Sequence, residues 1–382
     1  MAKRRRIALV YEYNENWIGG TYYIENLIAA LKTLPENTQP ELFIFLSKPE
    51  DFEKLKIRLS YTRVRRMDYS IKLSLVKRAI NKLTGSSKGF YFFKPYHQNI
   101  DVVFPADVNH NFLPEAKKIY WIPDFQEHYL PEYFTLQELE WRKKCQQATI
   151  QNGRYIVFSS NAARRDFNEI YPHSSMQQFV VPFAVSHNLS VGNLNLTEKY
   201  HLPEKFFICC NQLWKHKNHI IIIETIALLK QKGINIFVVF TGQEHDYRNP
   251  GFLEEIKYLV ATKGLENNIA FLGFIDRADQ LELMKMSIAV IQPSLFEGWS
   301  TVIEDAKSLG VPIIASSIEV HKEQLSSYVD FLIFDPGDAE ALASCISNIS
   351  KSKRNIKYSY ESKVQHFGKA FLSVVENIMT DN

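Results

Sequence analysis

The residues best suited to chemistry lie in one short segment, 292–306, which reads QPSLFEGWSTVIEDA. It follows an apolar run typical of a strand and opens a pattern typical of a helix. The first N–H groups of a helix have no partner within it and lie at the positive end of its dipole, so they bind anions readily. Glu297 precedes this helix start and Glu304 lies one turn into the helix, while Gly298 lets a ligand approach the backbone closely. The segment therefore predicts a site for an anionic ligand.

Glu304 also has a purely structural interpretation. The pattern Thr301-x-x-Glu304 matches a capping box, in which the two side chains satisfy each other's backbone N–H groups. On that interpretation Glu304 only stabilises the start of the helix. These residues alone leave both interpretations open.

The longer pattern Pro-Ser-x-x-Glu-Gly-Trp-x4-Glu-x-Ala-x3-Gly-x-Pro-Ile resembles the donor-site signature of the retaining glycosyltransferases of family four. The resemblance implies that Glu297 contacts hydroxyls of the donor sugar and that Glu304 contacts the ribose of the nucleotide. It also implies that the amides of Trp299, Ser300 and Thr301, which follow Gly298, hold the diphosphate. Seven residues usually separate the two glutamates in that family, whereas six separate them here.

A second match lies at Asn211–His219, after the first expected strand of the C-terminal half. The family usually carries an Arg and a Lys there, five positions apart, and both grip the diphosphate. Lys217 matches the Lys, whereas Gln212 stands where the Arg is expected. Lys215 and Arg248 are the candidates to replace the missing cation.

Weaker matches extend the resemblance along the chain. The implied donor site also includes Gly19, Gly20, Gly242, Phe274 and Ile275. The family often has a His-Asp pair near the reaction centre; here Pro123 takes the place of the His. Asp124 and His128 therefore remain as catalytic candidates beside Glu297 and Lys217. A capping Asp and an exposed His are the structural alternatives.

The elements that must position these residues alternate along the chain. Short β-branched or aromatic runs separate helical patterns in both halves, which predicts an α/β protein with parallel sheets covered by helices. The resemblance implies the GT-B fold, in which two Rossmann-like domains face each other across a cleft and a C-terminal helix crosses back to the first domain. We expect an acceptor-binding domain at 1–190, a nucleotide-sugar domain at 198–360 and the returning helix within 361–382, with a polar linker at 186–198.

The strand and helix expectations can be stated by residue. Strands are expected at 6–11, 41–46, 102–104, 119–122, 155–158, 179–181, 206–210, 234–240, 269–272, 288–291 and 312–315. Helices are expected at 22–34, 136–150, 162–170, 218–232, 253–263, 279–286, 301–309 and 362–379. The glycines at 19 and 20 are expected in a loop between the first strand and the first helix.

Composition limits the class of protein. The chain has 382 residues, of which 46% are apolar, 13% aromatic and 23% charged, so it is neither disordered nor fibrous. At roughly 150 residues per domain, two domains are expected. No apolar run reaches the roughly 18 to 20 residues that cross a membrane.

Four cysteines without framework spacing fit a reduced, cytosolic compartment. Cys209 and Cys210, with His216 and His219, raise the question of a zinc site. Neighbouring residues on a strand point to opposite faces, so buried core cysteines are the better interpretation.

A basic stretch suggests an anionic partner. Residues 1–190 carry 26 Lys and Arg against 19 Asp and Glu, a net of +7, and 54–88 holds most of the excess. Within it Ile71, Leu75, Ala79 and Leu83 recur at helical spacing, so a helix on an anionic membrane surface is one interpretation. A helix packed on its own domain is the other. No nucleic-acid motif accompanies the patch, which disfavours nucleic acid.

The resemblance implies retaining transfer of a hexose from a nucleoside diphosphate sugar to a saccharide or lipid-linked acceptor, in cell-surface polysaccharide or glycolipid assembly. No Asp-x-Asp pattern is present, so neither a metal nor another cofactor is expected. The expected location is the cytoplasm or, peripherally, the inner face of the cell membrane. A weakly catalytic partner or scaffold of the same fold, an epimerase and a phosphorylase stay open as alternatives. A nicotinamide dehydrogenase is disfavoured because no Gly-x-Gly-x-x-Gly follows the first strand.

Overall fold

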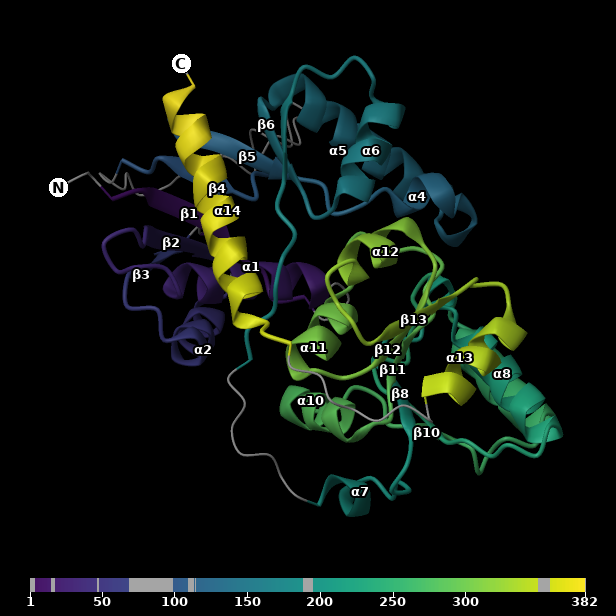
Figure 1. Cartoon of the computed structure of the whole chain (residues 1–382). Helices are drawn as coiled ribbons and strands as arrows, with labels where there is room; N and C mark the ends of the chain where they lie inside the picture. Colours follow the sequence, from purple (N-terminus) through teal and green to yellow (C-terminus); the bar gives the residue numbers. More distant parts are fainter. Residues whose placement is uncertain are drawn as a thin grey trace, which may run out of the picture.

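Two α/β domains, each built on a parallel sheet, make up the computed structural model (Figure 1). The structure describes residues 4–14, 18–46, 48–68, 99–108, 113, 115–187, 195–349 and 358–381. Every strand pairing recorded in the two sheets is parallel. This architecture is the predicted GT-B arrangement.

The N-terminal sheet has seven strands in the order β3-β2-β1-β4-β5-β6-β7. Their bounds are β1 Arg6–Val10, β2 Glu41–Leu46, β3 Val64–Asp68, β4 Val102–Phe104, β5 Lys117–Trp121, β6 Tyr155–Phe158 and β7 Gln177–Val180. The inner strands are apolar on both faces because helices cover both sides of the sheet. Strand β3 was not predicted, since its VRRMD sequence is mostly polar.

Helices flank this sheet on both sides. Their bounds are α1 Ile18–Lys32, α2 Pro49–Leu59, α4 Gln126–Tyr129, α5 Leu136–Asn152 and α6 Asn161–Ile170, with a 3₁₀ turn, η2, at Pro131–Tyr133. Helix α5 begins at a capping box between Thr135 and Glu138, which satisfies its first N–H groups. The expected loop at Gly19 and Gly20 is wrong, because α1 begins at Ile18 and includes both glycines in its first turn.

The C-terminal sheet has six strands in the order β10-β9-β8-β11-β12-β13. The strands are β8 Phe207–Cys209, β9 Val238–Phe240, β10 Ile269–Phe271, β11 Val290–Gln292, β12 Ile313–Ser316 and β13 Phe331–Phe334. The helices are α7 Leu196–Lys199, α8 His219–Gln231, α9 Phe252–Thr262, α10 Arg277–Met286, α11 Thr301–Leu309, α12 Glu319–Leu325 and α13 Ala339–Ile349, with a 3₁₀ turn, η3, at Lys215–Lys217. The elements α12, β13 and α13 were not predicted.

The two cores of this domain lie on opposite faces of its sheet. One cluster joins the sheet to α8, α9 and α13, and the other joins it to α10 and α11. Cys209 belongs to the first cluster and Cys210 to the second, and both are buried. The prediction of two core cysteines on opposite faces is therefore confirmed.

The last helix, α14 Glu361–Thr380, returns to the N-terminal domain and packs against α1 (Figure 1). Its Phe367, Phe371 and Val375 belong to the N-terminal core. A Cβ built on Gly368 would lie only 2.7 Å from the carbonyl oxygen of Ala30, so glycine permits the close packing of the two helices.

Two sequence expectations fall outside the described residues. The helical pattern at Ile71, Leu75, Ala79 and Leu83 lies within 69–98, and most of the polar linker lies within 188–194. In the described part of the chain, no helix combines the length and apolarity that crossing a bilayer requires.

Candidate active site

Two of the predicted site residues, Lys217 and Glu297, lie at the carboxyl ends of β8 and β11, which are neighbours in the C-terminal sheet. The segment after β8 carries Lys217 in η3, and the loop after β11 carries Glu297 before α11 begins. Ligands of doubly wound sheets bind at this edge. The order of the strands therefore brings together two residues that are 80 positions apart.

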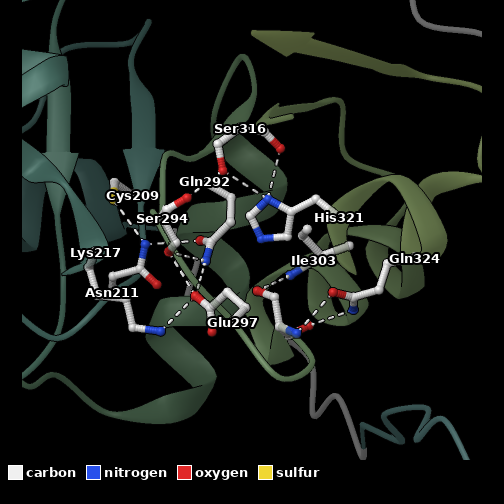
Figure 2. A network of polar contacts seen from close by, with 11 residues as sticks. Cys209, Asn211, Lys217, Gln292, Ser294, Glu297, Ile303, Ser316, His321 and Gln324 are labelled. Atoms are coloured by element: carbon white, nitrogen blue, oxygen red, sulfur yellow. Dashed lines mark hydrogen bonds and ion pairs between the residues drawn. The ribbon is translucent and has the colours of Figure 1, made fainter. Parts of the chain in front are cut away.

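Lys217 and Glu297 form a largely buried ion pair, with Nζ 2.6 Å from Oε1 (Figure 2). Only 17% of the Lys217 side chain and 10% of the Glu297 side chain is exposed. Gln292 and Ser294 also donate hydrogen bonds to Oε1, at 2.9 and 2.7 Å. Burial alone would raise the pKa of Glu297, but the charge of Lys217 and these bonds hold it below its usual value. The carboxylate is therefore ionised at neutral pH.

A second layer of side chains orients this pair. The side-chain amide of Asn211 donates to Oε1 of Gln292 at 2.9 Å, and Gln292 in turn contacts Glu297 (Figure 2). Asn211, Gln292 and Ser294 are all buried. A fully bonded polar network of this kind fixes the positions of its members.

Helix α11 begins one residue earlier than the capping-box interpretation requires. Ser300 is the N-cap, and its hydroxyl accepts from the N–H of Ile303. The Thr301–Glu304 capping box is therefore wrong, because Thr301 is the first residue of the helix. The N–H of Ser300 donates to Oε1 of Gln324 at 2.9 Å. The amides of Thr301 and Val302 precede the first possible bonds within the helix, so they remain the donors for an anion.

Glu304 lies in the buried interior. It accepts from Lys307 at 2.8 Å and from Gln324 at 3.1 Å, and it also accepts from the hydroxyl of Tyr360. Only 2% of its side chain is exposed. Tyr360 also accepts from the N–H of Val185, so this cluster joins α11 to both chain segments that connect the domains. The contacts of Glu304 are those of a structural carboxylate.

The neighbouring carboxylate, Asp305, was not predicted from the sequence. Its Oδ2 lies 2.6 Å from a guanidinium nitrogen of Arg277, and its Oδ1 lies 3.1 Å from Nε2 of His187. Burial alone would raise its pKa, but the charge of Arg277 holds the pKa below its usual value. Seven residues separate Asp305 from Glu297, which is the family spacing. Counting on that spacing would have identified Asp305.

Arg277 was also missed, because it follows the expected Phe274-Ile275 motif as an ordinary helix-start residue. Its guanidinium lies 5.1 Å from the ring centre of Tyr22, which directly follows Gly19, Gly20 and Thr21 in α1. Arg277 therefore joins the N-terminal glycine segment to Asp305. The two expected substitutes for the missing Arg have other contacts: Lys215 pairs with Glu255, and Arg248 lies over the rings of Trp214 and Phe134.

The N-terminal domain meets the site at Gly298. A Cβ at this position would lie 2.4 Å from the carbonyl oxygen of Pro123 and 2.8 Å from the Cβ of Asp124. Burial raises the pKa of Asp124, and the charge of Arg142 opposes this effect. His128 is exposed on α4, where its ring contacts Tyr129. The structure thus brings Asp124 to the Glu297 loop and leaves His128 on the surface.

The other predicted residues lie at neighbouring places on this edge. The amide of Gly242 donates to the carbonyl oxygen of Gly273, which precedes the exposed Phe274 and the partly buried Ile275. Gln212 donates to Gln243 at 3.3 Å. The indole of Trp299 donates to the carbonyl oxygen of Phe183, so its side chain joins the two domains. Within the described residues, no group of three or more His, Cys, Asp or Glu side chains could hold a metal ion.

Residues 197–365 match the family described as glycosyl transferases group 1. The O-antigen biosynthesis glycosyltransferase WclY of Escherichia coli is 23% identical over 174 residues, 45% of each chain. An Escherichia coli UDP-Gal:alpha-D-GlcNAc-diphosphoundecaprenol alpha-1,3-galactosyltransferase is 23% identical over 151 residues, 38% of this chain and 37% of that protein. The chain thus matches less than half the length of these two relatives.

A solved structure matches the whole chain. Anabaena Alr3699/HepE, crystallised in complex with UDP and glucose, aligns with a TM-score of 0.66 over 98% of this chain and 99% of its own. The two sequences are 15% identical, so this likeness establishes the fold.

Proposed function

We propose that this chain transfers a hexose from a nucleoside diphosphate sugar to an acceptor, because residues 197–365 match the group 1 glycosyl transferases. The observation that carries the proposal is the largely buried Lys217–Glu297 pair beside the start of α11. A cation, a carboxylate and free helix amides are grouped where a diphosphate and a sugar would lie side by side.

The proposed chemistry follows from the charges. The bond from the anomeric carbon to the diphosphate oxygen breaks, and the acceptor oxygen bonds to that carbon on the same face, with retention. The proton of the acceptor passes to the leaving diphosphate, so no protein nucleophile is required. Lys217, Arg277 and the amides of Thr301 and Val302 stabilise the charge that develops on the diphosphate. These groups supply the charge that a metal would otherwise supply, so we propose transfer without a metal.

The two carboxylates have different proposed roles. Glu297 orients the sugar by accepting hydrogen bonds from its hydroxyls. Asp305, which has the family spacing and lies beside Arg277, takes the ribose role that the resemblance assigned to Glu304. Asp124 and the Pro123 backbone approach the same loop from the N-terminal domain, which places them on the acceptor side.

The acceptor proposal rests on the relatives. The names of these relatives mention O-antigen biosynthesis and a diphosphoundecaprenol-linked sugar. We therefore propose a saccharide or lipid-linked acceptor in polysaccharide assembly for this chain. A lipid-linked acceptor would bring the chain to the inner face of the membrane. The basic stretch 54–88 is the proposed contact with that surface.

A thermal-shift panel with UDP, GDP, ADP, dTDP and CMP, each with EDTA or with magnesium, tests the donor site. A ligand at a hundred times its dissociation constant stabilises the fold by about 2.7 kcal/mol, which is readily measured. We expect one nucleoside diphosphate to raise the melting temperature equally in EDTA and in magnesium. A panel without any shift would contradict the proposal and favour the scaffold alternative. Release of an isomerised sugar without acceptor would favour an epimerase.

A further inference from the structure

His321, on α12, is a fully buried histidine that no sequence motif singled out. Its Nδ1 lies 3.0 Å from the carbonyl oxygen of Ser316 and 3.0 Å from the Ser316 hydroxyl oxygen (Figure 2). A carbonyl oxygen can only accept, so Nδ1 carries the hydrogen. The hydroxyl of Ser316 donates to the carbonyl oxygen of Ser294 at 2.6 Å, which leaves it free to accept from Nδ1 as well. These contacts fix the tautomer and the direction of the ring.

The other ring nitrogen is a bare acceptor. Nε2 of His321 is buried and has no hydrogen-bond partner among the described residues. Burial lowers the pKa of His321 to about 4, so the ring is neutral at physiological pH and Nε2 has no hydrogen to donate. Leaving a buried acceptor unpaired destabilises the fold, and native structures seldom tolerate one without a reason.

Nε2 of His321 points toward the side chains that surround Glu297. Figure 2 shows the Nε2 edge of the ring turned toward Glu297 and Gln292. The charges of Glu297 and Lys217 both act on the ring, which agrees with this direction. Neither of the facing side chains has a hydrogen to offer. Gln292 already donates to Ser294 and to Glu297, and Glu297 is an ionised acceptor.

We propose that Nε2 of His321 accepts a hydrogen bond from a hydroxyl of the transferred sugar, beside the hydroxyl bound by Glu297. This inference rests on the proposed function and narrows its substrate class. The hydrogen bonds that the described residues make to Glu297 all end on Oε1, so Oε2 is a second acceptor. Two neighbouring acceptors require two hydroxyl donors. The site therefore selects a hexose with two free hydroxyls on adjacent carbons and rejects one that is deoxygenated or acylated there.

The variant His321→Asn distinguishes the contribution of Nε2 from that of Nδ1. An asparagine amide stands about where Nδ1 stands and can donate to the Ser316 carbonyl, but it ends short of Nε2. The control is Lys322→Ala on the same helix, since Lys322 is half exposed and its one ion-pair partner among the described residues is Glu319, at 2.9 Å. The probes are UDP-glucose and GDP-mannose and, for whichever turns over, its 2-, 3-, 4- and 6-deoxy forms.

We expect His321→Asn to bind the nucleoside diphosphate within about twofold of the parent chain and to lose about ten- to a hundredfold in transfer of the intact sugar, as for one buried hydrogen bond. The parent chain should discriminate against one deoxy donor by a similar factor. His321→Asn should lose that discrimination at this one carbon and keep it elsewhere. Lys322→Ala should behave as the parent chain does.

Two results would overturn the inference. In the first, His321→Asn slows the intact donor and every deoxy donor by one common factor, or weakens nucleotide binding as much as transfer; His321 would then be structural. In the second, the parent chain neither binds a nucleoside diphosphate nor turns over a donor, which would remove the proposed function as well. An active parent chain distinguishes the two failures.

Discussion

At the scale of single residues, two adjacent carboxylates of α11 have opposite surroundings. Glu304 is enclosed by Lys307, Gln324 and Tyr360, whereas Asp305 faces Arg277 and His187. Successive side chains of a helix point about 100° apart. A spacing of six residues after Glu297 therefore gives the interior carboxylate of Glu304, whereas a spacing of seven gives Asp305, which lies near the glycine segment of α1.

This contrast predicts that the two carboxylates separate stability from ligand binding. Glu304→Gln should lower the free energy of unfolding by about 3 kcal/mol, because it leaves Lys307 buried without its charge partner. It should keep the affinity for the nucleoside diphosphate within a few-fold. Asp305→Asn should lower that affinity at least about tenfold, or about 1.4 kcal/mol. Denaturant unfolding and calorimetric titration of both variants measure the two effects, and the reverse pattern would restore Glu304 as the ribose ligand.

At the scale of elements, the loop after β11 contacts the N-terminal domain so closely that no side chain would fit at Gly298. The Cβ missing from Gly298 would fall within 2.4 Å of the Pro123 backbone. Gly298, which was expected to let a ligand approach the backbone, therefore permits close contact between the two domains. The cross-domain hydrogen bonds of Trp299 with Phe183 and of Glu323 with Asn161 accompany it.

Gly298→Ala should hold the two domains apart while each keeps its fold. We expect transfer to fall at least about tenfold, since loss of the closed arrangement misplaces the acceptor and admits water. Binding of the nucleoside diphosphate alone should weaken much less. The matched control is Gly251→Ala, whose added Cβ would meet nothing within 4 Å. Turnover and the radius of gyration from X-ray scattering test this expectation, and a fully active Gly298→Ala variant would contradict it.

The elements also show where sequence reasoning succeeds. Runs such as Glu41–Leu46 and Tyr155–Phe158 were predicted to the residue, because a parallel strand buried on both faces leaves an unbroken apolar pattern. The helix at Thr301–Leu309 was predicted equally well. Their motifs singled out Lys217 and Glu297, and the structure brings these two side chains together in one ion pair. Arg277, Asp305 and His321 were not singled out. The family spacing could have indicated Asp305, whereas Arg277 and His321 stand out only through their contacts with Asp305 and with Ser316, which no local pattern encodes.

At the scale of the whole molecule, three buried histidines link stability to pH. Burial lowers the pKa of His219 to about 3 and of His321 to about 4, and lowers that of His216 as well. Unfolding returns each to an ordinary pKa of about 6.5. Between about pH 6.5 and pH 4 the unfolded chain therefore binds more protons than the folded chain. This contribution to stability is complete above pH 6.5 and is lost as the pH falls.

The free energy of unfolding should accordingly decrease on acidification from pH 7 to pH 5. The slope approaches about 1 kcal/mol per pH unit for each histidine, and the raised pKa of Asp124 offsets part of it. Denaturant unfolding at a series of pH values measures the slope. His321→Asn should reduce this slope by the contribution of one histidine. A free energy of unfolding that does not change across this pH range would contradict the assignment of three neutral histidines.

The whole fold is also closed by its last element. Helix α14 packs on α1, and the segment just before it carries Tyr360, which bonds Glu304 of the C-terminal domain. The hydrogen bond between Tyr360 and Glu304 thus ties helix α11, which begins at Thr301, to the segment that returns to the N-terminal domain. The proposed sugar transfer would, on this arrangement, require both domains and the returning helix together.

The most direct test is to follow donor turnover by proton NMR in EDTA, with sugar conjugates of the nucleoside diphosphate identified by the thermal-shift panel and a set of saccharide acceptors. We predict release of the nucleoside diphosphate together with a new glycosidic bond of the same anomeric configuration as the donor. Lys217→Ala should reduce both signals by at least about a hundredfold. A product of inverted configuration, a requirement for a divalent metal, or full activity of Lys217→Ala would contradict the proposed site.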